Sequence, residues 1–91
     1  MRAVRLHITG RVQGVGYRAW AVKTAARLGV RGWVRNWADG SVEALVIGDE
    51  PAVAAMIEAY RQGPRAASVT KVAVSDAEDD DSPDFSARPS V

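Results

Sequence analysis

The first third of the chain changes from one pattern of apolar and polar residues to another. Over residues 3–9 every second residue is apolar, which is the spacing of a strand with one buried face. Residues 10–16 hold three glycines, and in residues 17–28 apolar side chains recur at the spacing of a helix that packs on one side. Gly29 can end that helix as its C-cap. The pattern therefore predicts a strand, a glycine-rich loop and a helix.

The middle of the chain predicts two strands joined by a tight turn. Over residues 30–37, valine and glycine alternate with arginine and tryptophan, and residues 41–47 are apolar at every position after Glu43. A nearly continuous apolar run is typical of a strand buried on both faces, so we expect residues 41–47 at the centre of a sheet. The sequence Ala-Asp-Gly at residues 38–40 fits a hairpin turn between the two strands.

The last part of the chain predicts one more helix, one more strand and a short closing segment. The helical spacing returns over residues 49–63, which begin with acidic residues and a proline and end in glycine. Residues 67–75 read as a fourth strand, and residues 76–84 as an acidic, proline-containing loop that holds six of the eleven acidic residues. We expect a short edge strand over residues 85–88 and a frayed end at residues 89–91, since Pro89 cannot donate to a strand ladder.

The predicted order of elements is βαββαβ, which favours an α+β, ferredoxin-like sandwich. In this arrangement an antiparallel sheet carries both helices on one face. The first and second strands run parallel with the third between them, so the loop after the first strand and the end of the second lie at the same edge. We expect a single domain over residues 1–91.

Composition narrows the possible functions. The 91 residues are 47% hydrophobic and 25% charged, with no cysteine and one histidine. These counts exclude disulfides, thiolate nucleophiles and zinc sites built from cysteine or several histidines, so the chemistry must run without these groups. We also expect no cofactor. No apolar run approaches the roughly 20 residues of a membrane span, and residues 1–9 do not resemble a signal peptide. We expect a monomer in the cytoplasm that does not bind membranes.

The glycine-rich segment indicates an anion site. Glycine allows positive φ angles and a close approach of the backbone to a ligand. The segment leads into a helix, whose first N–H groups have no intrahelical partner, and Arg18 in the first turn offers a fork of donors suited to phosphate oxygens. A tight connection followed by a surface arginine is the alternative explanation of the same residues.

Asn36 is the second candidate. It falls at the end of the second predicted strand, and strand alternation places it on the same face as Val34, toward the helices and the glycine-rich loop. A neutral amide can orient a water molecule beside a bound phosphoryl group without repelling it as a carboxylate would. The alternative is an asparagine that only shapes the hairpin next to Asp39 and Gly40.

Both candidates lie in segments that resemble motifs of a known family. The segment Gly10–Arg18, GRVQGVGYR, resembles the acylphosphatase loop signature, and the segment 32–36, GWVRN, followed by DGSV at 39–42, resembles the second signature. The resemblance implies hydrolysis of a small acyl phosphate to carboxylate and inorganic phosphate, with no metal and no covalent intermediate. It implies catalytic roles for Arg18 and Asn36, and phosphate binding by Gln13, Gly14, Val15, Gly16, Tyr17 and Arg18. The segment after Ser75 departs from the family pattern.

Two alternative functions are compatible with the same fold but involve no hydrolysis of a substrate. Trp33 and Trp37 alternate with Arg31 and Arg35 on the face of the sheet away from the helices, a pattern that can stack nucleic-acid bases. An RNA-binding domain of this fold carries its aromatics on the two central strands, where this chain has none facing outward, so we expect no nucleic-acid partner. A module that binds phosphate or carbamoyl phosphate without hydrolysing it is the other alternative.

Overall fold

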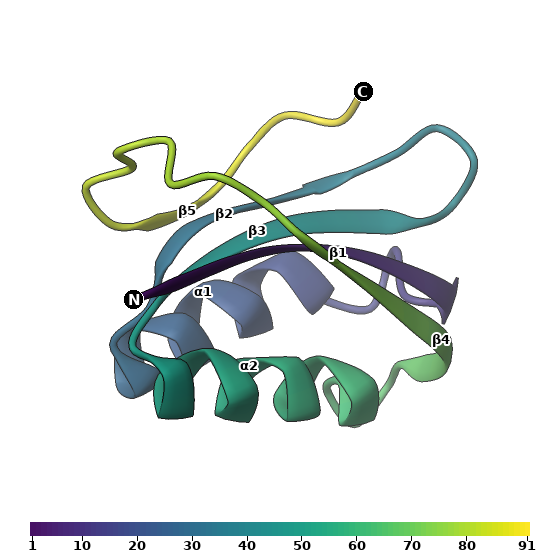
Figure 1. Cartoon of the computed structure of the whole chain (residues 1–91). Coiled ribbons are helices and arrows are strands. Elements are labelled where there is room, and N and C mark those ends of the chain that lie inside the picture. The colour runs from purple at the N-terminus through teal and green to yellow at the C-terminus, as the bar shows by residue number, and fades with distance from the viewer.

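The computed structural model describes residues 1–91 and confirms the predicted ferredoxin-like arrangement of one sheet and two helices. The elements are β1 (Arg2–Arg11), α1 (Tyr17–Leu28), β2 (Arg31–Asn36), β3 (Val42–Gly48), α2 (Glu50–Gln62), β4 (Ser68–Asp76) and β5 (Phe85–Ala87). Both helices cover the same face of the sheet (Figure 1). Neither helix has the length and apolar character needed to cross a membrane.

The sheet has the strand order β4-β1-β3-β2-β5, with β3 at the centre as expected. The pairs β1·β4, β1·β3 and β2·β3 are antiparallel, whereas β5 lies parallel to β2. The sheet is therefore mixed, because the chain crosses over the sheet after β4 and returns to the far edge in the same direction as β2. The expectation of a short edge strand near residue 85 is confirmed.

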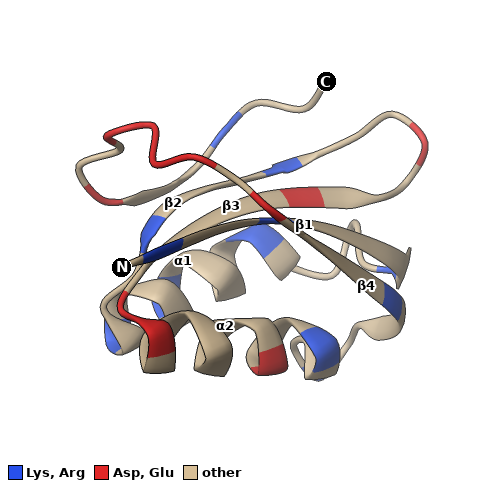
Figure 2. Cartoon of the chain, in the orientation of Figure 1, with Lys and Arg blue, Asp and Glu red and all other residues tan.

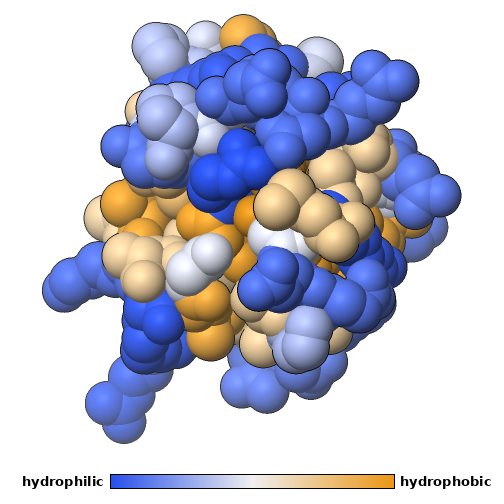
Figure 3. Space-filling model, turned by 60° about the vertical axis from the view of Figure 1, so that its left-hand side comes forward, coloured by the Kyte–Doolittle hydropathy of each residue, from blue (hydrophilic) through white to orange (hydrophobic).

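The main core lies between the sheet and the helices. Seventeen buried residues form it, and the alternating residues Val4, Leu6 and Ile8 of β1 are fully buried within it. In Figure 3, hydrophilic residues cover most of the visible surface, and apolar ones show mainly across the middle. The period of two in β1 has therefore placed its apolar side chains on the face that the helices cover.

The opposite face of the sheet, where the sequence pattern placed Trp33, is partly covered. Trp33, Leu45 and Ile47 form a second buried cluster there, and Trp33 is only 4% exposed. The acidic segment between β4 and β5 crosses this face (Figures 1 and 2). Trp33 Nε1 donates a hydrogen bond to Asp80 Oδ2 at 3.2 Å, so the tryptophan stabilises the fold of the acidic segment.

At the C-terminal end, where we expected fraying, Val91 forms backbone hydrogen bonds with the end of β2 and the turn that follows it. The N–H of Val91 donates to the carbonyl of Asn36 at 2.9 Å, and the N–H of Ala38 donates to the Val91 oxygen at 2.7 Å. The N–H of Arg88 donates to the carbonyl of Val34 at 2.8 Å. These bonds continue the pairing of β5 along β2, because the outer edge of β2 still offers unpaired backbone groups beyond the end of β5.

Candidate active site

One cavity contains both residues that the sequence singled out. It lies between the loop that follows β1 and the end of β2, and its volume is about 240 Å³. It is lined by Val12, Gln13, Gly14, Gly16, Tyr17, Arg18, Ala19 and Asn36. The loop and the β2–β3 hairpin meet at the same end of the sheet (Figure 1). Of the six residues expected at the phosphate, five line the cavity. The exception is Val15, which packs against the main core.

The glycines of the loop have two different roles. Gly14 and Gly16 have φ angles of 71° and 75°, in the left-handed region that residues with a β-carbon avoid. Gly10 instead lies within β1, where an added β-carbon would come within 2.3 Å of the Ser68 carbonyl oxygen. Gly10 therefore serves the sheet, since it allows β4 to pair closely with β1 at an irregularity in the ladder.

The start of α1 offers hydrogen-bond donors without protein acceptors. Gly16 is the N-cap, no side chain caps the helix, and the first turn contains no acidic residue. The first intrahelical bond runs from Trp20 N to Gly16 O at 3.0 Å, so the N–H groups of Tyr17, Arg18 and Ala19 lie in the turn where no helical acceptor exists. An anion in the cavity would meet these donors and the positive end of the helix dipole.

Arg18 is half-buried in the cavity wall and forms no ion pair. Its Nη1 donates to the carbonyl oxygen of Arg88 at 3.1 Å, which holds the side chain against the C-terminal segment. Five other arginines each pair with a carboxylate: Arg2, Arg5, Arg31, Arg35 and Arg88. The charge of Arg18 is therefore not neutralised within the protein, although its position is fixed.

Asn36 is held by its backbone while its side chain has no partner. Asn36 pairs with Val42 in the β2·β3 ladder, and its backbone carbonyl accepts a hydrogen bond from the N–H of Val91. None of the side-chain hydrogen bonds within the chain involves its amide group, which is half-buried at the cavity. An amide with free donors and a free acceptor can hold a water molecule toward the cavity.

Gln13 has a contact that the sequence did not reveal. Its side-chain Nε2 donates to the carbonyls of Trp37 and Ser41, both at 2.7 Å, and so ties the loop to the β2–β3 hairpin. The expectation for Gln13 concerned phosphate binding, and no local pattern indicates acceptors 24 and 28 residues away. The bond fixes the separation between the loop and Asn36.

Tyr17 anchors the start of α1. Its hydroxyl donates to the carbonyl of Tyr60 at 2.8 Å, and the two rings stack with their centroids 5.9 Å apart. Burial raises the pKa of Tyr17 well above its ordinary value. The Tyr17 hydroxyl therefore stays protonated and does not act as an acid or base. Tyr17 contributes its backbone to the cavity.

The side chains that line the cavity limit its chemistry. Arg18 is the one charged side chain among them, and the lining contains no carboxylate, imidazole or thiol. Such a site can bind an anion and orient a water molecule, but no nucleophilic or general-base side chain is at hand. It suits a substrate whose leaving group departs without strong acid assistance.

Comparisons with known proteins identify the same family. The family model for acylphosphatase matches residues 4–87. The chain is 50% identical over 91 residues to an acylphosphatase of Rhodospirillum rubrum, with 100% of each chain covered. It is 61% identical over 70 residues to one of Rhizobium etli, covering 77% of this chain and 74% of the relative. The crystal structure of acylphosphatase from Bacillus subtilis has a TM-score of 0.93 to this chain and 35% identity, covering 97% of this chain and 99% of that one.

Proposed function

This chain belongs to the acylphosphatase family, and from that premise we propose that acyl phosphates are hydrolysed in the cavity between the β1–α1 loop and Asn36. The protein is an acylphosphatase, an enzyme that acts on small molecules with a carboxyl–phosphate bond. Its products are a carboxylate and inorganic phosphate.

The loop and Arg18 bind the phosphate in this proposal. The left-handed Gly14 and Gly16 turn the backbone around the cavity, and the uncapped start of α1 adds N–H donors. Arg18 supplies two or more further donors and the positive charge that the phosphate oxygens need. Gln13 contributes its backbone to the loop while its side chain keeps the loop against the hairpin.

Asn36 orients the attacking water. The water oxygen forms a bond to phosphorus while the bond from phosphorus to the acyl oxygen breaks. The acyl group leaves as a carboxylate, and both protons of the water stay on the phosphate, which is released as dihydrogen phosphate. Because a carboxylate is a good leaving group, the reaction depends on positioning and charge stabilisation and needs no covalent intermediate. The observation that carries the proposal is the unpartnered Asn36 amide in the same cavity as the unpaired Arg18.

The remaining expectations belong to the same proposal. We propose a single domain over residues 1–91 that works as a monomer in the cytoplasm and does not bind nucleic acid. Burial of Trp33 and the pairing of Arg31 with Asp79 and of Arg35 with Glu43 count against the RNA-binding alternative, because they occupy its stacking and phosphate-binding groups. Light scattering after gel filtration tests the monomer, and cell fractionation tests the location.

The proposal is tested by Asn36→Ala with benzoyl phosphate as substrate. We expect kcat to fall on the order of a hundred- to a thousandfold, while inorganic phosphate still inhibits with an unchanged constant. Asn36→Asp keeps the size but adds a negative charge, so it should weaken phosphate inhibition as well. Gln62→Ala removes an exposed amide at the end of α2 and serves as the control. Normal turnover by Asn36→Ala would refute the proposed role.

A further inference from the structure

Glu43 is a nearly buried carboxylate on the sheet face away from the helices. It lies in the central strand β3 and is 8% exposed. Burial by itself raises the pKa of Glu43, but hydrogen bonds from Trp37 and Arg35 and the nearby guanidinium groups outweigh burial and lower it. Glu43 is therefore ionised at neutral pH despite its burial.

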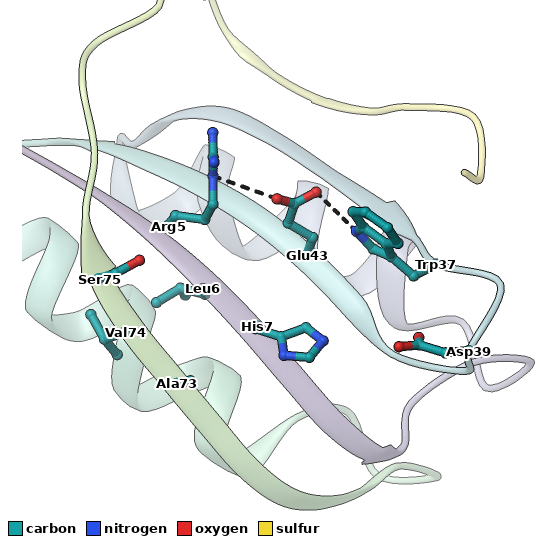
Figure 4. A pocket seen from close by; sticks show the side chains of 9 residues that line it. All are labelled: Arg5, Leu6, His7, Trp37, Asp39, Glu43, Ala73, Val74 and Ser75. Carbon is teal, nitrogen blue, oxygen red and sulfur yellow. Dashed lines mark hydrogen bonds and ion pairs between the residues drawn. The ribbon is translucent and has the colours of Figure 1, made fainter.

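The two residues that flank Asn36 both bind one oxygen of Glu43. Arg35 Nε donates to Glu43 Oε1 at 2.7 Å, and Trp37 Nε1 donates to the same atom at 2.9 Å. Figure 4 shows the carboxylate between the indole of Trp37 and Arg5, whose Nε lies 3.5 Å from Oε2. Strand alternation explains this geometry, since Arg35 and Trp37 must face opposite to Asn36.

Aromatic rings restrict the same segment further. The Arg35 guanidinium carbon lies 4.8 Å from the Trp33 ring centroid and 5.7 Å from that of Trp37. The arginine is therefore held between two indoles as well as by Glu43. Among the side chains on this face, Glu43 is the group that hydrogen-bonds to both neighbours of Asn36.

We propose that Glu43 is a positioning residue for hydrolysis, which fixes the direction of the Asn36 amide by clamping Arg35 and Trp37 on the opposite face of the sheet. The proposal rests on the proposed function of Asn36. A rotation of the β2 end would swing the Asn36 side chain across the cavity. The clamp prevents this rotation, because Arg35 and Trp37 both donate to the same oxygen of Glu43, which is fixed in the central strand.

Stability alone is a weaker explanation of this arrangement. A buried ion pair often contributes little to stability compared with apolar side chains of similar volume. An apolar residue at position 43 would also pack on Trp33 and Trp37, but it would give no direction to the Arg35 and Trp37 donors. The carboxylate orients the Arg35 and Trp37 side chains and, through them, the Asn36 amide. Hydrolysis requires this orientation, whereas packing does not.

The test compares Glu43→Gln with Glu50→Gln. Glu43→Gln keeps the volume, but a neutral amide offers one acceptor oxygen and turns an N–H₂ group toward the remaining donors. We expect kcat for benzoyl phosphate to fall on the order of ten- to a hundredfold, with KM and the phosphate inhibition constant unchanged. Glu50→Gln also removes a carboxylate from an arginine pair, that of Arg2, but at an exposed site, and should leave both parameters unchanged.

Two further variants separate positioning from stability. Trp37→Phe removes one donor to Glu43 and keeps the ring, so it should lower kcat by a smaller factor and decides the question if Glu43→Gln does not fold. In the Asn36→Ala background, Glu43→Gln should cause no additional loss, because the group it positions is gone. An equal loss in that background overturns the proposal. The proposal is also overturned if kcat is unchanged in both Glu43→Gln and Trp37→Phe while Asn36→Ala is slow. This result would leave the proposed role of Asn36 intact.

Discussion

Two connecting segments of this protein differ in how many of their polar groups find hydrogen-bond partners within the chain. In the acidic segment between β4 and β5, Asp79 accepts from Arg31 and from the N–H of Asp81, and Asp80 accepts from Ser82 and Trp33. In the loop between β1 and α1, the start of the helix has no side-chain cap.

The arginines next to the two segments, Arg31 in β2 and Arg18 in α1, differ in the same way. Arg31 pairs with Asp79 at 2.6 Å, whereas Arg18 contacts a backbone carbonyl and no carboxylate. Groups that find partners within the chain stabilise the fold, and groups that are held in place without a partner are available to a ligand. The two segments therefore differ in function because the acidic one is bound by partners within the chain, whereas the start of α1 keeps donors that a ligand can use.

The largest effect should come from exchanging the arginines for alanine. Arg18→Ala should lower kcat/KM for benzoyl phosphate on the order of a thousandfold and abolish inhibition by inorganic phosphate, with the free energy of unfolding unchanged. Arg31→Ala should do the reverse, lowering the free energy of unfolding and leaving kcat/KM unchanged, because its partner is Asp79. Steady-state kinetics and urea unfolding of both variants measure the contrast. A loss of activity in Arg31→Ala equal to that in Arg18→Ala would abolish the distinction between the regions.

A smaller effect separates the two ends of α1. Gly16 and Gly29 share left-handed conformations, with φ of 75° and 77°, and an added β-carbon would contact nothing within 4 Å at either position. Gly16→Ala and Gly29→Ala should each lower the free energy of unfolding by about 1 kcal/mol. Only Gly16→Ala should also raise the phosphate inhibition constant, because it changes the loop around the cavity. Equal phosphate inhibition in the two variants would show that the loop backbone does not bind the anion.

The smallest expected effect is a change in how the stability of the fold depends on pH, and it comes from the acidic segment. Hydrogen bonds, chiefly from Arg31 to Asp79 and from Ser82 to Asp80, hold the pKa of each carboxyl below its ordinary value of 3.8. These groups therefore stabilise the fold at pH above 3.8, and this contribution is lost as the pH falls through their lower folded-state pKa.

The double variant Asp79→Asn, Asp80→Asn tests this contribution. It should be less stable than the parent protein at neutral pH, and its stability should fall less steeply below pH 3.8. Turnover at neutral pH should not change, since neither residue lines the cavity. Thermal unfolding across the acid range measures the first effect, and parallel curves for the two proteins would contradict it.

Local patterns were sufficient for most of the fold. The helix predicted over residues 17–28 has those bounds in the structure, and Gly29 is its C-cap. The alternation around Leu6 and the continuous apolar run in β3 predicted the buried face and the central strand. These features depend on residues that are neighbours along the chain, so their spacing is visible in the sequence.

The pairing of distant segments was less predictable. The acidic segment has no periodicity, and its residues contact Arg31 and Trp33 from 47 or more residues away. The pattern placed Trp33 on an outward face, and the burial of this residue depends on a loop that no local rule would lay across the sheet. The pairing of Val91 with Asn36 and Ala38 has the same origin.

The sequence by itself determined the order of the elements, because helical spacing and strand alternation are local, and it made Arg18 and Asn36 candidates through motifs that resemble those of acylphosphatases. Only the tertiary structure decided how that pair is held. Gln13 joins the loop to the hairpin, and Glu43 joins both neighbours of Asn36 on the other face. Side-chain geometry across strands depends on register and sheet twist, which are fixed when the whole sheet assembles.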